Sequence, residues 1–594
     1  MKLYKNLLLG AMSGVLLTGC IDDKYDLSDI DTTSQFKITD LVLPLNLDPV
    51  LLSDIIKIEE GEKLTEVTIN GNTFYAVEQS GSFYSEGIKI NAFTAYPDPM
   101  EKEQAVFRPA GTPRAAKKKV PGVVSYFELE SPVTEELKYN ATGIDGSLRD
   151  LSKINFNEVL FTISISTKSV SSEVKTKLTD VKLHLPEGLG VTYVKAGEIS
   201  FSPEVYNPAD GTVEIDGFDI KDNAAVITIA ATSIDFKDYK VNPFAYDAFT
   251  NTGAFHLNSM FTMEEGRLQV EGPADEMAAL QEISYDVVYS LGTITATSIR
   301  GDIEYNLEGT GLEINPVDLT DIPGFLEDPE TDLILNNPQI YLKLMNPIGK
   351  YGLSYQSGLD IMAHRNGDYK TFNGPEIKVP AEEGTFNFLL AQQPDKVVNI
   401  PSDYANDITR TTYNNLSYIL SGEGLPKTLD INLVNPMIPR QTVTSDFQLG
   451  QNITGMSGDY MFLAPLSLRE GSRIVKSIDG WWSEDLSDLH IDYLTIKADA
   501  TNGLPTGVIL NLYAIDREGN RISTEGSLKL DENAVDSPIE ITVQKLEGVP
   551  FDNLDGIRLY VIAGNNSGAT LSPTQTITLE NIKAKVTGNY TKKL

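Results

Sequence analysis

Short runs in which apolar and polar residues alternate constrain the fold of this chain most. In Phe161-Thr-Ile163-Ser-Ile165-Ser every second residue is apolar, which is the two-residue period of a strand with one buried face. Turn-forming residues separate such runs, and the pattern predicts an all-β fold of tandem antiparallel β-sandwich domains with few short helices. Further runs of this kind are Ala225–Ile229, Val508–Tyr513, Ile557–Val561 and Ile577–Leu579.

The length of 594 residues is too great for one ordinary hydrophobic core. Shifts in composition and turn clusters predict several domains behind an N-terminal leader. The predicted segments are a signal peptide at 1–19, an acidic tether at 20–36, a β-rich N-terminal domain at 37–150, β-sandwich domains at 151–310 and 311–465, and a C-terminal β-sandwich at 466–594.

Two strand-like runs end in Asn-Pro, at Asn346-Pro347 and at Asn435-Pro436. Proline cannot donate to a strand ladder and Asn closes turns through its side chain, so both pairs predict the end of a strand. The two runs resemble strands of the LEA-type (water-stress) β-sandwich, which implies such a fold for 311–465. The alternative is that the Asn-Pro pairs only form turns and indicate no particular fold.

The N-terminus has the layout of an export signal. Lys2 and Lys5 supply positive charge, and the apolar run Leu7–Leu17 follows them. That run is about half of the roughly 20 apolar residues that a membrane-spanning helix needs. The segment therefore predicts export of the chain rather than a membrane span.

The only cysteine follows this run directly, in Leu17-Thr18-Gly19-Cys20. The tetrapeptide resembles the lipobox of bacterial lipoproteins, which implies acylation of Cys20 and removal of the leader before it. An ordinary secretory signal with an incidental cysteine is the alternative. Two or three acyl chains anchor a protein stably, so the expected partner is a membrane.

Two acidic residues, Asp22 and Asp23, come almost directly after Cys20. They resemble the export signal that carries lipoproteins of Bacteroidota-type bacteria to the outer face of the outer membrane. The resemblance implies a chain that is lipid-anchored in the outer membrane and exposed at the cell surface.

The formal net charge of −36 repels phosphate backbones and argues against a nucleic-acid partner. One cysteine allows no internal disulfide, and the four histidines show no zinc-binding spacing. We expect no cofactor and no metal site. A structural calcium ion is an open alternative, but no ligand pattern in the sequence supports one.

The two tryptophans, Trp481 and Trp482, stand side by side in an acidic stretch. In an extended segment their side chains point to opposite faces, so one indole could serve as a platform for a sugar ring. Burial of both at a domain junction is the alternative. No catalytic residue is nominated, because no nucleophile or phosphate-binding motif appears in the mature chain.

These features favour a non-catalytic role. We expect a lipid-anchored binding protein of the outer membrane that captures a glycan or a protein, or that serves as an accessory component of the envelope. Two other classes stay open: an adhesin or structural stalk protein, and a surface glycoside hydrolase, which would need only two suitably spaced carboxylates.

The lipobox generates the first prediction. Replacing Cys20 with alanine removes the acylated thiol, so Cys20→Ala abolishes fatty-acid labelling and membrane retention, whereas the unchanged chain keeps both. Protease added to intact cells degrades the unchanged chain if it is exposed at the surface. A labelled, membrane-bound Cys20→Ala variant would contradict the anchor, and full protection from protease would place the chain in the periplasm.

Overall fold

The computed structural model describes the strand-forming bulk of the chain. The described residues are 33–44, 63–110, 123–308, 314–320, 337–365, 367–420, 426–466, 473–478, 489–504, 506–549, 551, 554–563 and 570–593. They form two compact units. Unit 1 takes its described residues from 1–57 and 468–594, and unit 2 takes them from 58–327 and 334–467.

The fold is all-β, as the alternating pattern predicts. Antiparallel pairs make up the sheets, and within the described residues the single parallel pair joins β24 (Gly384–Ala391) to β25 (Thr409–Thr412). Helices in the described part of the chain are short: α3 (Ala274–Ala279), α5 (Leu416–Ile419) and the 3-10 helices η2 (Pro203–Val205), η3 (Pro347–Tyr351), η4 (Pro394–Lys396) and η5 (Ser402–Tyr404).

Unit 1 is a sandwich of two four-stranded sheets. Gly526 shows how closely they pack, because a Cβ at this position would lie 2.5 Å from Ile541 and 3.0 Å from Val543 of the other sheet. One sheet has the order β1 (Thr33–Pro44), β35 (Ile577–Lys593), β30 (Leu489–Asn502) and β33 (Ser537–Gln544). The other has the order β29 (Arg473–Ile478), β34 (Leu554–Ala563), β31 (Val508–Asp516) and β32 (Gly526–Leu530).

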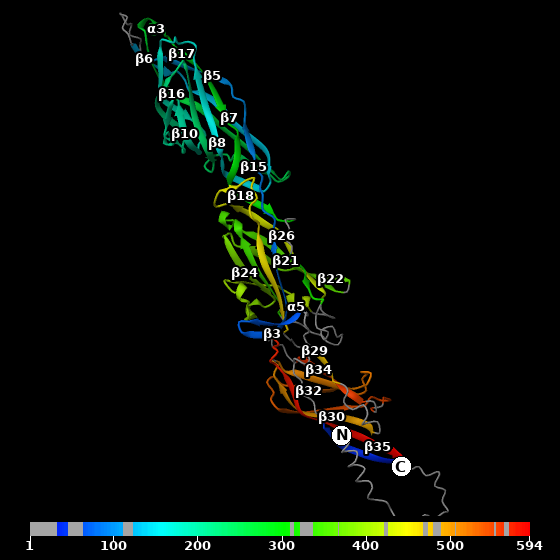
Figure 1. Cartoon of the computed structure of the whole chain (residues 1–594). Coiled ribbons are helices and arrows are strands. Elements are labelled where there is room, and N and C mark those ends of the chain that lie inside the picture. The colour runs from blue at the N-terminus through cyan, green and yellow to red at the C-terminus, as the bar shows by residue number, and fades with distance from the viewer. Residues whose placement is uncertain are drawn as a thin grey trace, which may run out of the picture. The chain divides into compact units, whose positions relative to one another are not determined.

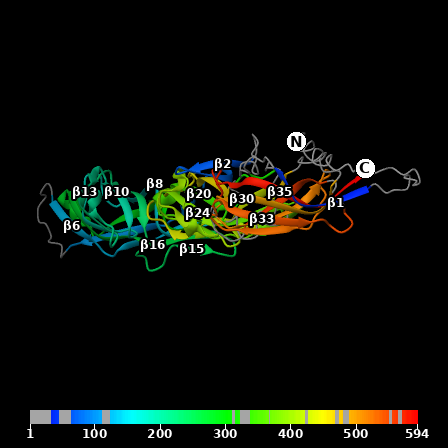
Figure 2. The ribbon, with the colours of Figure 1, turned by 90° about the horizontal axis from the view of Figure 1, so that it is seen from below.

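The first described strand, β1, pairs with the last one, β35. Thr33 lies opposite Lys593 and Pro44 opposite Lys583 in an antiparallel ladder with one irregularity. The blue and red strands run side by side in Figures 1 and 2. A segment near the N-terminus thus completes the C-terminal sandwich, a pairing that no local sequence pattern predicted.

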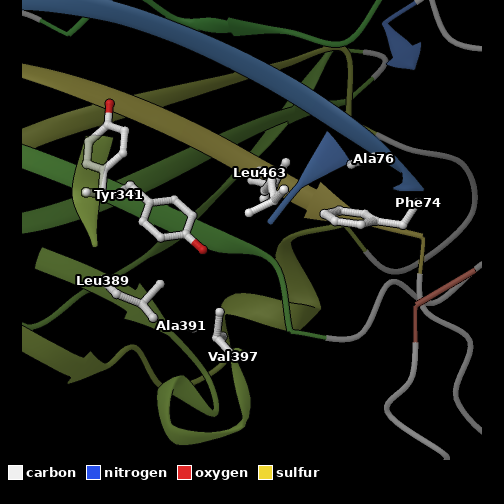
Figure 3. Close-up of a cluster of buried hydrophobic side chains, with 9 residues drawn as sticks. Phe74, Ala76, Tyr341, Leu389, Ala391, Val397 and Leu463 are labelled. Atoms are coloured by element: carbon white, nitrogen blue, oxygen red, sulfur yellow. The ribbon is translucent and has the colours of Figure 1, made fainter. Parts of the chain in front are cut away.

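Unit 2 contains a six-stranded sheet. A buried hydrophobic cluster includes Phe74, Tyr341, Leu389 and Leu463 from its strands, and Val397 from the segment after β24 belongs to the same cluster (Figure 3). The strand order is β2 (Leu64–Ile69), β3 (Asn72–Tyr84), β28 (Ser457–Pro465), β20 (Gln339–Asn346), β24 (Gly384–Ala391) and β25 (Thr409–Thr412).

The remaining strands of unit 2 form one connected network of ladders. Its members are β4 (Thr94–Pro97), β5 (Lys102–Pro109), β6 (Val123–Leu129), β7 (Val133–Asp145), β8 (Leu148–Ser166), β9 (Lys175–His184), β10 (Leu189–Ala196), β11 (Ile199–Phe201), β12 (Tyr206–Asn207), β13 (Thr212–Ile220), β14 (Ala224–Asp235), β15 (Phe244–Asp247), β16 (Thr252–Gly272), β17 (Ile283–Leu291), β18 (Ile294–Asn306), β19 (Val317–Asp318), β21 (Tyr355–Arg365), β22 (Asp368–Phe372), β23 (Glu376–Val379), β26 (Thr428–Thr442) and β27 (Phe447–Gln448).

Long strands connect this network. The 19-residue β8 pairs with β14 along one edge, and with β17 and β18 along the other. Strand β18 then pairs with β26 from Asp302 to Asn306. The ladder therefore continues from β8 through β18 and β26 to β21, which pairs with β22 and β23.

The alternating run that predicted a strand is confirmed. Phe161, Ile163 and Ile165 lie in β8 and are buried, while the hydroxyl residues between them are more exposed. The other four runs also lie in strands: β14, β31, β34 and β35. The division at residues 150, 310 and 465 stays a prediction.

One of the two Asn-Pro predictions is confirmed and the other is wrong. Strand β20 ends at Asn346, and η3 begins at Pro347. Strand β26, in contrast, continues through Asn435-Pro436 to Thr442. Val434 lies opposite Gly358 and Met437 opposite Gln356, so two residues face one across a bulge, and Asn435 takes a φ of +49°. Asn therefore bends this strand instead of ending it.

The buried amide of Asn346 generates a stability prediction. Its Nδ2 donates to the carbonyls of Leu353 and Pro380 at 2.8 Å each, and its Oδ1 accepts from Ile348 N at 3.2 Å. Asn346→Ala leaves these buried groups unpaired and should cost about 2–3 kcal/mol of unfolding free energy.

Asn207→Ala is the matched control, because Asn207 also precedes a proline and accepts from Ala209 N, but at an exposed turn. It should cost less than about 1 kcal/mol. Pulse proteolysis of the full chain in urea measures both variants. Equal effects would show that burial of the Asn346 amide does not stabilise unit 2.

Candidate functional site

A polar groove opens on unit 2 between β22 and the region of α5. Its volume is about 400 Å³. Sites for small ligands usually measure about 300–1,000 Å³, so the groove has the size of a ligand site. We call it the amide groove, because three asparagines belong to its lining: Lys370, Thr371, Phe372, Asn373, Asn414, Asn415 and Tyr418.

The first wall is the end of the β21–β22 hairpin. Strand β22 pairs with β21, so that Lys370 lies opposite Ala363 and Phe372 opposite Ile361. The first four residues of β22 are exposed, and Phe372 at its end is buried. Burial of Phe372 fixes the strand, which presents Lys370 and Thr371 to the groove.

The turn after β22 is held by its surroundings. Gly374 N donates to Asp360 Oδ1 at 3.0 Å, and a Cβ on Gly374 would lie 1.8 Å from Leu359 O. The hydroxyl of Tyr413 donates to Phe372 O at 2.5 Å. Burial raises the pKa of Tyr413, and the charge of Asp360 raises it further, so this hydroxyl keeps its proton at neutral pH.

The second wall is formed by Asn414, Asn415 and α5. Asn415 takes a φ of +66°, a left-handed conformation that Asn adopts more easily than most residues. Helix α5 buries Leu416 and Ile419 and leaves Tyr418 46% exposed. Arg365 Nη2 donates to Ile419 O at 2.7 Å, which ties α5 to the hairpin of the first wall.

The lining suits a ligand rich in hydroxyl groups. Each asparagine amide offers donors and an acceptor, and Thr371 adds a hydroxyl. The ring of Tyr418 gives an apolar surface beside these polar groups. The described residues of the lining include no carboxylate, nucleophilic cysteine or histidine. Their chemistry can bind and orient a ligand, and it supplies no acid–base pair.

The structure does not place the residues nominated from the sequence. Cys20, Trp481 and Trp482 are outside the described residues, so the lipid attachment and the indole platform stay predictions. The amide groove was missed. Its sequence signals were Asn373-Gly374 and the pair Asn414-Asn415, which are also ordinary turn formers.

A second cavity lies between the sheets of unit 2 and has a volume of about 10 Å³. This is room for about one water molecule, and the lining is almost wholly apolar, with residues such as Leu344, Leu433 and Met456. The hydroxyl of Tyr355 is buried there and has no hydrogen-bond partner among the described residues. The cavity is a packing void too small for a ligand.

Metal ligands do not gather in the described part of the chain: it contains no group of three or more His, Cys, Asp or Glu residues placed to hold an ion. None of the helices found in that part is both long enough and apolar enough to cross a membrane.

Comparison with known proteins found structural likeness at low sequence identity. No protein-family model matches the chain, and no curated protein matches it. A solved structure of a "putative secreted protein" from Parabacteroides distasonis is similar over 49% of this chain and 89% of its own length, with 16% identity and a TM-score of 0.33. No family is assigned on this basis.

The bond between Tyr413 and Phe372 generates a prediction about the groove. Tyr413→Phe removes the hydroxyl that donates to Phe372 O, so this carbonyl at the groove wall loses its hydrogen bond from Tyr413. The variant should lose about 1–2 kcal/mol of unfolding free energy in unit 2, measured by pulse proteolysis in urea.

Tyr369→Phe is the matched control, since Tyr369 is exposed on the same hairpin and its loss of a hydroxyl should change stability by less than about 0.5 kcal/mol. If both variants unfold alike, the Tyr413 hydroxyl does not hold the groove wall.

Proposed function

We propose that this chain is a lipid-anchored binding protein on the outer face of the outer membrane, and that it captures a glycan in the amide groove. The order of positive residues, apolar run, lipobox and acidic pair around Cys20 supports the anchor and its location. The composition of the amide groove carries the proposed ligand class.

The groove favours a glycan for three reasons. Amides at Asn373 and Asn414 can exchange hydrogen bonds with ring hydroxyls in both directions. The exposed ring of Tyr418 can pack against the C–H face of a sugar. The volume suits one or a few sugar units, whereas protein partners usually cover about 800 Å² of surface on each side.

Binding without turnover fits this lining better than hydrolysis does. A glycoside hydrolase places two carboxylates about 5–10 Å apart across its substrate. The described lining residues of the groove include no acidic residue, so they supply neither of these carboxylates. The groove is therefore proposed as a capture site, and the indoles of Trp481 and Trp482 stay a separate proposed platform.

A glycan-array screen of the full chain tests the proposal. Asn373→Ala, Asn414→Ala and Tyr418→Ala each remove a ligand contact and should weaken retained binding at least tenfold, since one lost contact of about 1.4 kcal/mol has this effect. Asn415 is left unchanged because its positive φ would strain an alanine.

Tyr84→Ala is the matched control, because Tyr84 is 73% exposed on β3 and does not belong to the groove lining. It should bind like the unchanged chain. Trp481→Ala and Trp482→Ala, screened in parallel, distinguish the two proposed sites. Full binding by the three groove variants would overturn the groove as the capture site.

A further inference from the structure

The charge of the amide groove differs from that of the chain as a whole. The chain has 84 acidic and 48 basic residues, yet the described lining contains one cation, Lys370, and no carboxylate. A ligand carboxylate in the groove would therefore meet a positive group. We infer that the groove selects acidic saccharides, with Lys370 binding a uronate carboxylate. This inference rests on the proposed function of the same site.

Lys370 is placed for such a contact. Its Nζ lies 5.1 Å from the ring centre of Phe372, and that ring is fixed by burial. A cation–π contact of this kind restrains an otherwise flexible ammonium group. The contact leaves the donors of the ammonium group available to an anion.

No anion among the described residues is paired with Lys370. Among the described residues it forms no ion pair, whereas Lys378 on the neighbouring β23 pairs with Glu376 at 3.0 Å. The nearest acid along β22 is Asp368, which lies opposite Arg365 at the start of the hairpin. A ligand carboxylate could therefore pair with Lys370 without displacing a described partner.

The neutral groups of the groove complete the match. A uronic acid unit presents a carboxylate, several hydroxyls and an apolar C–H face. The ammonium group of Lys370 complements the carboxylate. The amides of Asn373 and Asn414 complement the hydroxyls, and the ring of Tyr418 complements the C–H face. Hydrogen bonds to a charged group are stronger than neutral ones, so the carboxylate contact should dominate selection.

The long-range field of the chain works against this selection. A net charge of −36 repels an anion at distance. At 0.15 M salt the screening length is about 8 Å, so the local contact decides the outcome. Short acidic oligosaccharides, which carry few charges, should therefore bind better than long polyanions.

Calorimetric titration of the full chain with trigalacturonate and with its methyl ester tests the inference, because esterification removes the negative charges of the probe and adds only a methyl group to each carboxylate. At 0.15 M salt the unchanged chain should bind the free acid at least tenfold more tightly than the ester. Lys370→Gln should lower affinity for the acid to that for the ester and leave the ester unaffected. Lys370→Arg should keep the preference.

Lys378→Gln is the control, since it removes an exposed lysine beside the same hairpin and should not change either affinity. Equal binding of acid and ester by the unchanged chain would overturn acid selection and leave glycan capture standing. Binding of neutral saccharides without binding of either galacturonate probe would also overturn acid selection and leave glycan capture standing. Absence of all saccharide binding would overturn both proposals.

Discussion

Backbone pairing along a few long strands holds unit 2 together. Strand β8 shares one edge between β17 and β18, and β18 in turn pairs with β26. Each rung satisfies an N–H and a carbonyl that would otherwise be buried without partners. The position of the β21–β22 hairpin depends on this ladder because β21 pairs with β26. The amide groove therefore lies on a rigid scaffold, although its lining comes from strand ends and turns.

The fold class could be predicted from sequence because it depends on local alternation. Phe161, Ile163 and Ile165 identify a strand and its buried face without knowledge of any partner. Strand partners could not be predicted, since pairing joins residues that are far apart in sequence. The bulge at Asn435 also escaped prediction, because the same dipeptide ends β20 at Asn346 and only the neighbouring strands decide between the two outcomes.

The groove could not be predicted for a related reason. Its walls come from residues 370–373 and 414–418, which only the tertiary fold brings together. Locally, asparagines in such segments indicate turns, and nothing in the sequence distinguishes an amide that closes a turn from one that faces a ligand. The nominated residues Cys20, Trp481 and Trp482 depend on local motifs alone, and they stay predictions.

The ladder between β1 and β35 has a consequence for the order in which the two units can fold. Strand β1 begins at Thr33, and its only described partner ends at Lys593. Synthesis runs from the N-terminus, so β1 has no neighbour until Ile577–Lys593 have been made. Unit 1 is thus completed after unit 2, and removal of β35 leaves β1 as an unpaired edge where the sandwich should close.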